Sequence, residues 1–294
     1  MLKRMEVFFI ASMFILFTTV ILVVYTMQRE QEFITHNNDI QLAVVQGAAY
    51  AINLQLQNKR RHVRLFVDEY ADLFLHLDKH PKDETKSKAI ITRLQQRFPD
   101  FFTYTITDNQ GEPILFDIDM LVGEACQSDL NNYASKMKWK HTELNNEVVI
   151  HPQPFHYHYD IMSPLQSKVS KTRIFFSSFY LSEIANILKT HEVPGLQLFL
   201  TRQSEPSLIE VSRNGARDKL KRDVNLSYDE RTIIHAYQDL PESDWRLVVL
   251  PDSSIKQDYV NKLWEEVIIV LAIVALALYV LITFMFKLTE NKNN

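Results

Sequence analysis

The sequence predicts an α+β protein in which a long N-terminal helix precedes two antiparallel sheets, with a membrane-spanning helix at each end. Two apolar runs without any charge, at 7–27 and 267–286, indicate the spans. A helical apolar repeat follows the first run, and the chain between about 100 and 250 then mixes strand patterns with short helices. Because strands and helices do not alternate regularly, we expect antiparallel pairing rather than a parallel sheet.

Composition excludes several classes of function. Of 294 residues, 46% are hydrophobic and 23% are charged, which is typical of a folded chain. The net charge of −4 offers no basic surface for nucleic acid. The 5 glycines match neither a dinucleotide nor a phosphate-binding loop, so we expect no cofactor. G-x-S-x-G, H-E-x-x-H and C-x-x-C motifs are absent, and we do not expect an enzyme.

Each apolar run matches the about 20 residues that a helix needs to cross a bilayer. The first is longer than the about 7–15 apolar residues of a cleavable signal peptide, which favours an uncleaved anchor. Basic residues on the outer flank of each span predict cytoplasmic tails, 1–6 and 287–294, and place the region between the spans outside the cytoplasm. These flanking residues are Lys3, Arg4, Lys287 and Lys292.

Residues 28–80 are expected to form one spine helix, about 80 Å long, because no proline occurs before Pro81. Such a rod is too long to be buried by one small domain, so we predict that its apolar seam also packs on a second copy, giving a homodimer. The basic cluster 59–64 is interpreted as a solvated face. The seam comprises Val45, Ala49, Ile52, Leu56, Lys59, Val63, Phe66, Tyr70, Leu73 and Leu77.

Residues 81–190 are predicted to form the larger, membrane-distal module. Its strands are rich in β-branched and aromatic residues, and 108–111 supply turn chemistry for a hairpin. We expect helices at 86–97, 128–137 and 181–189, and strands at 101–107, 113–117, 147–162 (one strand broken at two prolines) and 172–180.

Residues 191–262 are predicted to form a smaller, membrane-proximal module. Its helix begins at Ser227, and Glu230 three residues later has the spacing of a capping box. A final helix from about Ser253 runs into the second span without proline or glycine, so movement of the closing strand can reach the membrane. The other elements are strands at 195–201, 207–212 and 245–250, a turn at 213–215 and a helix at 227–236.

In this order, the elements over roughly 28–262 resemble double Cache domains, the extracellular sensor domains of bacterial membrane receptors. The resemblance rests on the long helix after the first span, the hairpin at 104–111 and the closing strand within 240–249. The stretches 155–162 and 174–179 are similar to sensor regions upstream of diguanylate cyclases. The resemblance implies two PAS-like sheets stacked on the spine, a periplasmic location and an anchor in the bacterial inner membrane.

Two departures from the family shape the expected function. The chain lacks the helix motif with which amino-acid-binding members hold an α-amino and carboxylate group, so no amino-acid ligand is expected. Only 287–294 follow the second span, where those receptors continue into an output domain. We therefore predict a sensor subunit that binds a small molecule and signals to a separate membrane protein. The alternatives are the sensor part of a truncated receptor and a scaffold subunit that binds only protein.

The candidate ligand-binding residues are His156, His158 and Asp160. Side chains alternate along a strand, so these three are expected on one face and the aromatic residues between them on the other. The pattern fits a solvated strand face, a pocket for a polar small molecule, or a site for zinc or another divalent cation. We expect no resident metal, and these residues are the alternative metal site.

Two further residues complete the candidate site. Arg173, on the next strand, has the charge to neutralise an acidic ligand, and Tyr104 lies in the hairpin that carries the resemblance. His151 is separated from the other histidines by two prolines, and we do not expect it on the same face. Cys126, the single cysteine of the chain, is expected to be buried.

Overall fold

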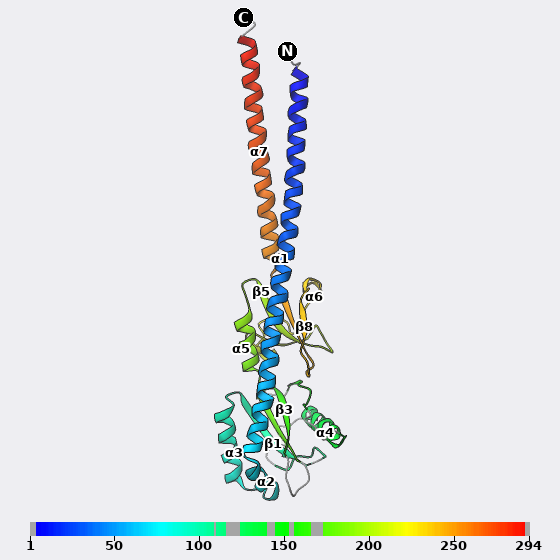
Figure 1. Ribbon diagram of the computed structural model, residues 1–294, viewed down its shortest axis with the longest axis vertical. Coiled ribbons are helices and arrows are strands. Elements are labelled where there is room, and N and C mark those ends of the chain that lie inside the picture. Colours follow the sequence, from blue (N-terminus) through cyan, green and yellow to red (C-terminus); the bar gives the residue numbers. More distant parts are fainter. Residues whose placement is uncertain are drawn as a thin grey trace. The chain divides into compact units, whose positions relative to one another are not determined.

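The structure is a computed structural model that describes residues 4–108, 110–115, 124–139, 145–152, 156–165 and 173–291 (Figure 1). The chain forms two compact units: residues 1–40 with 252–294, and residues 41–251. The second unit contains two antiparallel sheets together with helices, which confirms the predicted α+β class.

The first unit holds two apolar helices, the start of α1 (Arg4–Glu69) and α7 (Ser253–Asn291). Both are long and apolar enough to cross a membrane. Their large apolar side chains are mostly exposed, as expected of residues that face lipid. The two helices contact each other where the ring of Phe33 stacks on that of Tyr259, with centroids 4.1 Å apart.

The distal sheet has four strands in the order β1-β4-β3-β2, and all of its pairings are antiparallel. Strands β1 and β4 pair along nearly their whole length, with Thr107 opposite Ile174 and Phe101 opposite Phe179. The strands are β1 (Phe101–Thr107), β2 (Ile150–Pro152), β3 (Tyr157–Leu165) and β4 (Arg173–Tyr180), and the accompanying helices are α2 (Ala71–Lys79), α3 (Glu84–Arg97) and α4 (Glu124–Trp139).

Two predicted strands of this module are wrong. The chain does return against β1 at 113–114, where Thr107 bridges Pro113 and the Ile114 amide donates to the Ile106 carbonyl oxygen at 2.8 Å. Residues 113–115 form no strand, however, and residues 116 and 117 lie outside the described part of the chain. Proline has no N–H with which to extend the ladder. The expected single strand 147–162 is instead a pair, because β2 and β3 run antiparallel with His151 opposite His158.

The proximal sheet has five strands in the order β7-β6-β5-β9-β8. Ser227 and Glu230 form the predicted capping box at the start of the short helix α6. Helix α5 packs against strands of this sheet, although the predicted boundary at 190 placed it in the distal module. The elements are α5 (Ser182–His191), β5 (Leu196–Arg202), β6 (Ile209–Ser212), β7 (Gly215–Ala216), η2 (Arg217–Lys219), α6 (Tyr228–Ile233), β8 (Tyr237–Asp239) and β9 (Trp245–Pro251).

The predicted spine helix is interrupted once. Helix α1 ends at Glu69, and Tyr70, with φ −110° and ψ 20°, separates it from α2. The break follows from packing, because the ring of Phe74 in α2 lies 4.9 Å from that of Phe175 in β4. We therefore attribute the end of α1 to the packing of α2 on the distal sheet, and not to the apolar repeat of the sequence.

The apolar seam of α1 packs within its own chain. Its members from Val45 to Phe66 are buried in the second unit, so the prediction that the seam contacts a second copy is wrong. The physical reason is that two sheets, rather than one small domain, cover this length of helix. The side chains that α1 leaves exposed lie elsewhere, and the homodimer itself stays a prediction. These exposed residues include Leu42, Tyr50, Leu54 and Leu65.

Two leucines on α1 test this assignment. Leu56 is fully buried, whereas Leu54 is 43% exposed. We expect Leu56→Ala to lower the free energy of unfolding by about 2–5 kcal/mol because it leaves a cavity. The matched Leu54→Ala variant should change it by less than about 0.5 kcal/mol. Thermal unfolding of the full-length protein, followed by circular dichroism, measures both, and equal losses would contradict the assignment.

Candidate functional site

A cluster of polar side chains lies on the face of the distal sheet that packs against α4. The apolar surroundings are provided by Leu130 and Tyr133 of α4 together with Met162 and Phe176 of the sheet. In this setting, polar atoms are costly unless they have partners. The cluster comprises Cys126 of α4, His151 of β2, and His158 and Asp160 of β3, which are 1%, 5%, 0% and 2% exposed.

The nitrogen, sulfur and oxygen atoms of the cluster lie close together. Nε2 of His158 is 3.5 Å from Sγ of Cys126 and 3.7 Å from Oδ1 of Asp160. Nε2 of His151 is 3.3 Å from Oδ2 of Asp160 and 3.1 Å from Oδ2 of Asp129. The arrangement therefore joins one thiol, two imidazoles and one carboxylate that come from three different elements.

Neighbouring groups determine how these side chains are oriented. Nδ1 of His158 lies 3.1 Å from the carbonyl oxygen of His156. Because a carbonyl oxygen only accepts, Nδ1 carries the proton, and in the neutral ring Nε2 presents a lone pair to the cluster. Oγ of Ser178 donates to Oδ1 of Asp160 at 2.6 Å. Oδ2 of Asp160 accepts no hydrogen bond from the described residues.

Burial is the main influence on protonation in the cluster. It raises the pKa of Asp160, against the opposing charges of His151 and His158. At His158, by contrast, burial lowers the pKa, although the charge of Asp160 opposes this effect. At His151 burial also lowers the pKa, but the nearby carboxylates of Asp129 and Asp160 outweigh it, and the pKa is raised. His158 is thus favoured as a neutral imidazole.

The structure brings together only part of the predicted histidine face. His158 and Asp160 share it, as the alternation predicted, but His156 is exposed and its ring packs edge-on against Phe102 and Tyr180, each at 5.7 Å. The reason is that β3 begins at Tyr157, so the strand period does not extend to His156. The exclusion of His151 was wrong, since the β2–β3 pairing places it opposite His158.

The other two predicted residues lie away from the cluster. The Tyr104 hydroxyl is 3.1 Å from Oγ of Ser87 in α3. Nε of Arg173 pairs with Oδ1 of Asp78 in α2 at 3.0 Å, so its charge is already balanced. Cys126 is buried, as expected, but its position beside His158 has no signal in the sequence because the two residues are far apart along the chain.

Two basic residues at the middle of α1 join the distal and proximal modules. Nζ of Lys59 lies 2.5 Å from Oδ1 of Asp100 and 2.8 Å from Oε2 of Glu183. Arg60 pairs with Glu242 at 2.5 Å and donates to its carbonyl oxygen at 3.1 Å. Lys59 and Arg60 are 4% and 6% exposed, so the interpretation of this cluster as a solvated face was wrong for both.

A pocket of about 340 Å³ opens between the distal sheet and the β7–η2 segment of the proximal sheet. Both modules contribute residues to the walls of this cavity. Within the proximal part, the φ of Gly215 is +128°, a backbone conformation that favours glycine, and a Cβ atom there would lie 2.7 Å from Cδ of Lys219. The pocket is lined by His156, Tyr157, Tyr180, Leu181, Ser182, Gly215, Ala216, Asp218 and Lys219.

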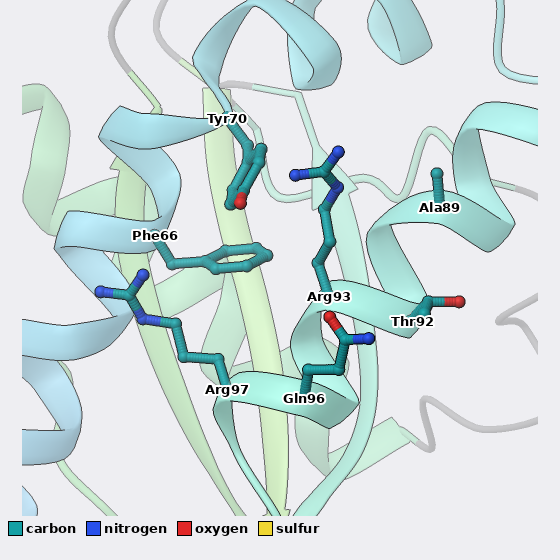
Figure 2. A pocket seen from close by; sticks show the side chains of 7 residues that line it. All are labelled: Phe66, Tyr70, Ala89, Thr92, Arg93, Gln96 and Arg97. Atoms are coloured by element: carbon teal, nitrogen blue, oxygen red, sulfur yellow. The ribbon is translucent and has the colours of Figure 1, made fainter.

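A second hollow, of about 660 Å³, lies between the end of α1 and helix α3 (Figure 2). Figure 2 shows Arg93 extending towards the ring of Tyr70, with Phe66 below it. The Arg93 guanidinium lies 4.7 Å from the centre of that ring, and Arg97 pairs with Glu69 at 2.8 Å. Because both cations already have partners, this hollow is a weaker candidate for a ligand than the pocket between the modules.

No family model and no curated protein matches this sequence. Solved structures with a similar arrangement of helices and strands include ligand-binding and periplasmic domains. The likeness concerns the arrangement of helices and strands only. One of these structures is the ligand-binding domain of Mlp24 with asparagine, with 13% identity over 79% of this chain and 98% of that chain, and a TM-score of 0.48. Another is the ligand-binding domain of the Pseudomonas aeruginosa PAO1 amino acid chemoreceptor PctB with L-Gln, with 13% identity over 78% of this chain and 98% of that chain, and a TM-score of 0.45. A third is the Vibrio cholerae LuxQ periplasmic domain, with 12% identity over 73% of this chain and 98% of that chain, and a TM-score of 0.42.

The buried Lys59 pair allows a test by substitution. Lys59→Met leaves the Asp100 carboxylate buried without its cation, and we expect it to lower the free energy of unfolding by about 3–5 kcal/mol at neutral pH. Lys88→Met is the matched control, because Lys88 and Glu84 form an ion pair with side chains 75% and 80% exposed. Its effect should lie within about 1 kcal/mol.

The pH dependence of the same pair provides a second readout. Burial and the charge of Glu183 raise the pKa of Asp100, while Lys59 opposes the rise. Loss of Lys59 raises that pKa further, so the deficit of Lys59→Met is largest at neutral pH and shrinks as acid protonates Asp100. Thermal unfolding at several pH values measures this trend. A deficit that grows on acidification would contradict it.

Proposed function

We propose that this protein is a membrane-anchored extracytoplasmic sensor that binds a polar small molecule between its two modules and signals through its membrane helices to a separate membrane protein. The observation that carries the proposal is the pocket of about 340 Å³, whose walls come from the distal and the proximal module. Its volume is within the about 300–1,000 Å³ of small-molecule sites. An occupant therefore contacts both modules at once.

The lining of the pocket indicates the chemistry of the ligand. Tyr157 and Tyr180 offer aromatic surface, and Asp218 and Lys219 offer charges of both signs. The guanidinium of Arg217 lies 5.4 Å from the centre of the Tyr157 ring, but its charge is balanced by Glu210 at 2.5 Å, so Lys219 is the cation that the pocket lining offers. A small molecule with an aromatic or aliphatic body and a charged group fits this lining best.

The junction next to Arg60 supports a role in coupling. Glu242 is a non-glycine residue with positive φ, 56°, a conformation that costs energy and is often found at switch regions. The backbone beside it bonds to the distal module, since Val148 donates to the Glu242 carbonyl oxygen at 2.9 Å and Asp244 donates to that of Val148 at 3.1 Å. Strand β9 then ends at Pro251, and α7 begins at Ser253.

Ligand binding is tested with the full-length protein in detergent micelles. A panel of amino acids, carboxylates and amines is screened by thermal shift, and a ligand at a hundredfold excess over its Kd should stabilise the protein by about 2.7 kcal/mol. Tyr180→Ala and Lys219→Ala should reduce the shift, whereas His62→Ala, at an exposed position of α1, should retain it. A ligand whose shift survives both pocket variants would place its site elsewhere.

Transfer to a partner is tested in the second span. Helices in lipid associate by close packing at small residues, and Ala272 and Ala275 are exposed on α7. We expect Ala272→Leu with Ala275→Leu to uncouple a partner without disturbing ligand binding. Photo-reactive residues at these two positions should crosslink to a second protein, while one at Val270, on the opposite side of the helix, should not. Crosslinks to lipid or self alone would overturn lateral transfer.

A further inference from the structure

We propose that Cys126, His158 and Asp160, with His151 as fourth ligand, form a zinc-binding site buried in the distal module. This site is distinct from the small-molecule pocket and does not depend on it. It also differs from the metal alternative predicted from the sequence, because Cys126 and His151 take the place of His156. The proposal rests on ligand distances, on the groups that orient the ligands and on charge balance.

Three of the four proposed ligand atoms already lie close enough together to share one ion. Those of Cys126, His158 and Asp160 all lie within 4.8 Å of one another. With zinc–sulfur and zinc–nitrogen or zinc–oxygen bonds of about 2.3 and 2.0–2.2 Å, neighbouring ligand atoms are about 3.3–3.6 Å apart. Sγ of Cys126 and Nε2 of His158 are 3.5 Å apart, and Nε2 of His158 and Oδ1 of Asp160 are 3.7 Å apart. Nε2 of His151 lies 3.3 Å from the other oxygen, Oδ2, and has to approach to complete the site.

The surrounding hydrogen bonds are those that zinc ligands use. A ligating histidine usually donates its other ring N–H to a carbonyl or carboxylate, as Nδ1 of His158 does to the His156 carbonyl oxygen at 3.1 Å. Ser178 holds Oδ1 of Asp160 at 2.6 Å. The second oxygen, Oδ2, belongs to a side chain only 2% exposed and accepts no hydrogen bond from the described residues. It is the oxygen that lies beside His151.

A divalent cation balances the charge of the ligands in the forms that bind metal. A thiolate and a carboxylate carry two negative charges, and two neutral imidazoles add none, so Zn²⁺ neutralises these four groups. The soft thiolate beside imidazole selects zinc over magnesium or calcium, which prefer oxygen ligands. Asp129, whose Oδ2 lies 3.1 Å from Nε2 of His151, has a side chain 31% exposed and adds a further negative charge at the edge of the cluster.

Cobalt is the probe for this site. Full-length protein is stripped of metal in detergent micelles and titrated with Co²⁺, whose charge-transfer absorption reports a bound thiolate. Cys126 is the single cysteine of the chain, so this band is specific to it. We expect one Co²⁺ per chain with tetrahedral d–d bands, and displacement of cobalt by Zn²⁺. A wild-type protein that shows no thiolate band would overturn the proposal, and the cluster would then be a metal-free hydrogen-bonded network.

Substitutions separate the ligands from their neighbours. Cys126→Ser should abolish the charge-transfer band, His151→Gln should retain it with weaker binding, and Ser178→Ala should weaken binding by about 10–100-fold. His156→Gln is the matched control: it keeps the backbone carbonyl that orients His158 and should bind cobalt as the wild type does. Circular dichroism checks that each variant is folded. If His156→Gln loses the band while folded, the ligand set is wrong, whatever the outcome of the small-molecule screen.

Discussion

The ion pairs of Lys59 and Arg60 with buried or half-buried carboxylates constrain the rest of the second unit. A buried cation is tolerated only beside its counter-charges, so Lys59 must face Asp100 and Glu183. The rotation of α1 that points Lys59 at these carboxylates also brings Leu56 and Val63 into the core. One residue further, Arg60 points to Glu242. Adjacent residues on one helix thereby hold the distal and the proximal module in register.

Features that depend on neighbours in the sequence could be predicted. The spans follow from uninterrupted apolar runs, the capping box from Ser227 and Glu230, and strand β1 from its composition. Pairings between distant segments could not. Residues 113–117 follow turn residues and therefore look like the partner of β1, but the partner is β4, more than sixty residues further along the chain. Thr107 lies opposite Ile174 of β4 on one side and bridges Pro113 on the other, so both segments adjoin β1, but no local pattern indicates the longer pairing with β4.

The candidate metal cluster shows the same limit at the level of single side chains. The strand period places His158 and Asp160 on one face, and it fails at His156 only because β3 starts one residue later. His151 joins them through the reversal of the chain between β2 and β3, and Cys126 through the packing of α4 on the sheet. Neither the β2–β3 reversal nor the packing of α4 produces a periodic pattern in the sequence, so Cys126 and His151 could be assigned to the cluster only from the structure.

The cluster and the junction between the modules are joined by Asn146. Its side chain donates to the Asp160 carbonyl oxygen at 2.8 Å and accepts from the Met162 amide at 3.0 Å, so it is fastened to the strand that carries the cluster. Its own carbonyl oxygen accepts from Arg60 at 2.9 Å, and Arg60 also donates to the carbonyl oxygen of Glu242, whose φ is positive. Asn146 and Arg60 therefore form a continuous set of hydrogen bonds from β3 to Glu242, a residue in a conformation that costs energy. Because Glu242 is bonded to Val148 and lies three residues before β9, this set of contacts reaches the strand that leads into α7.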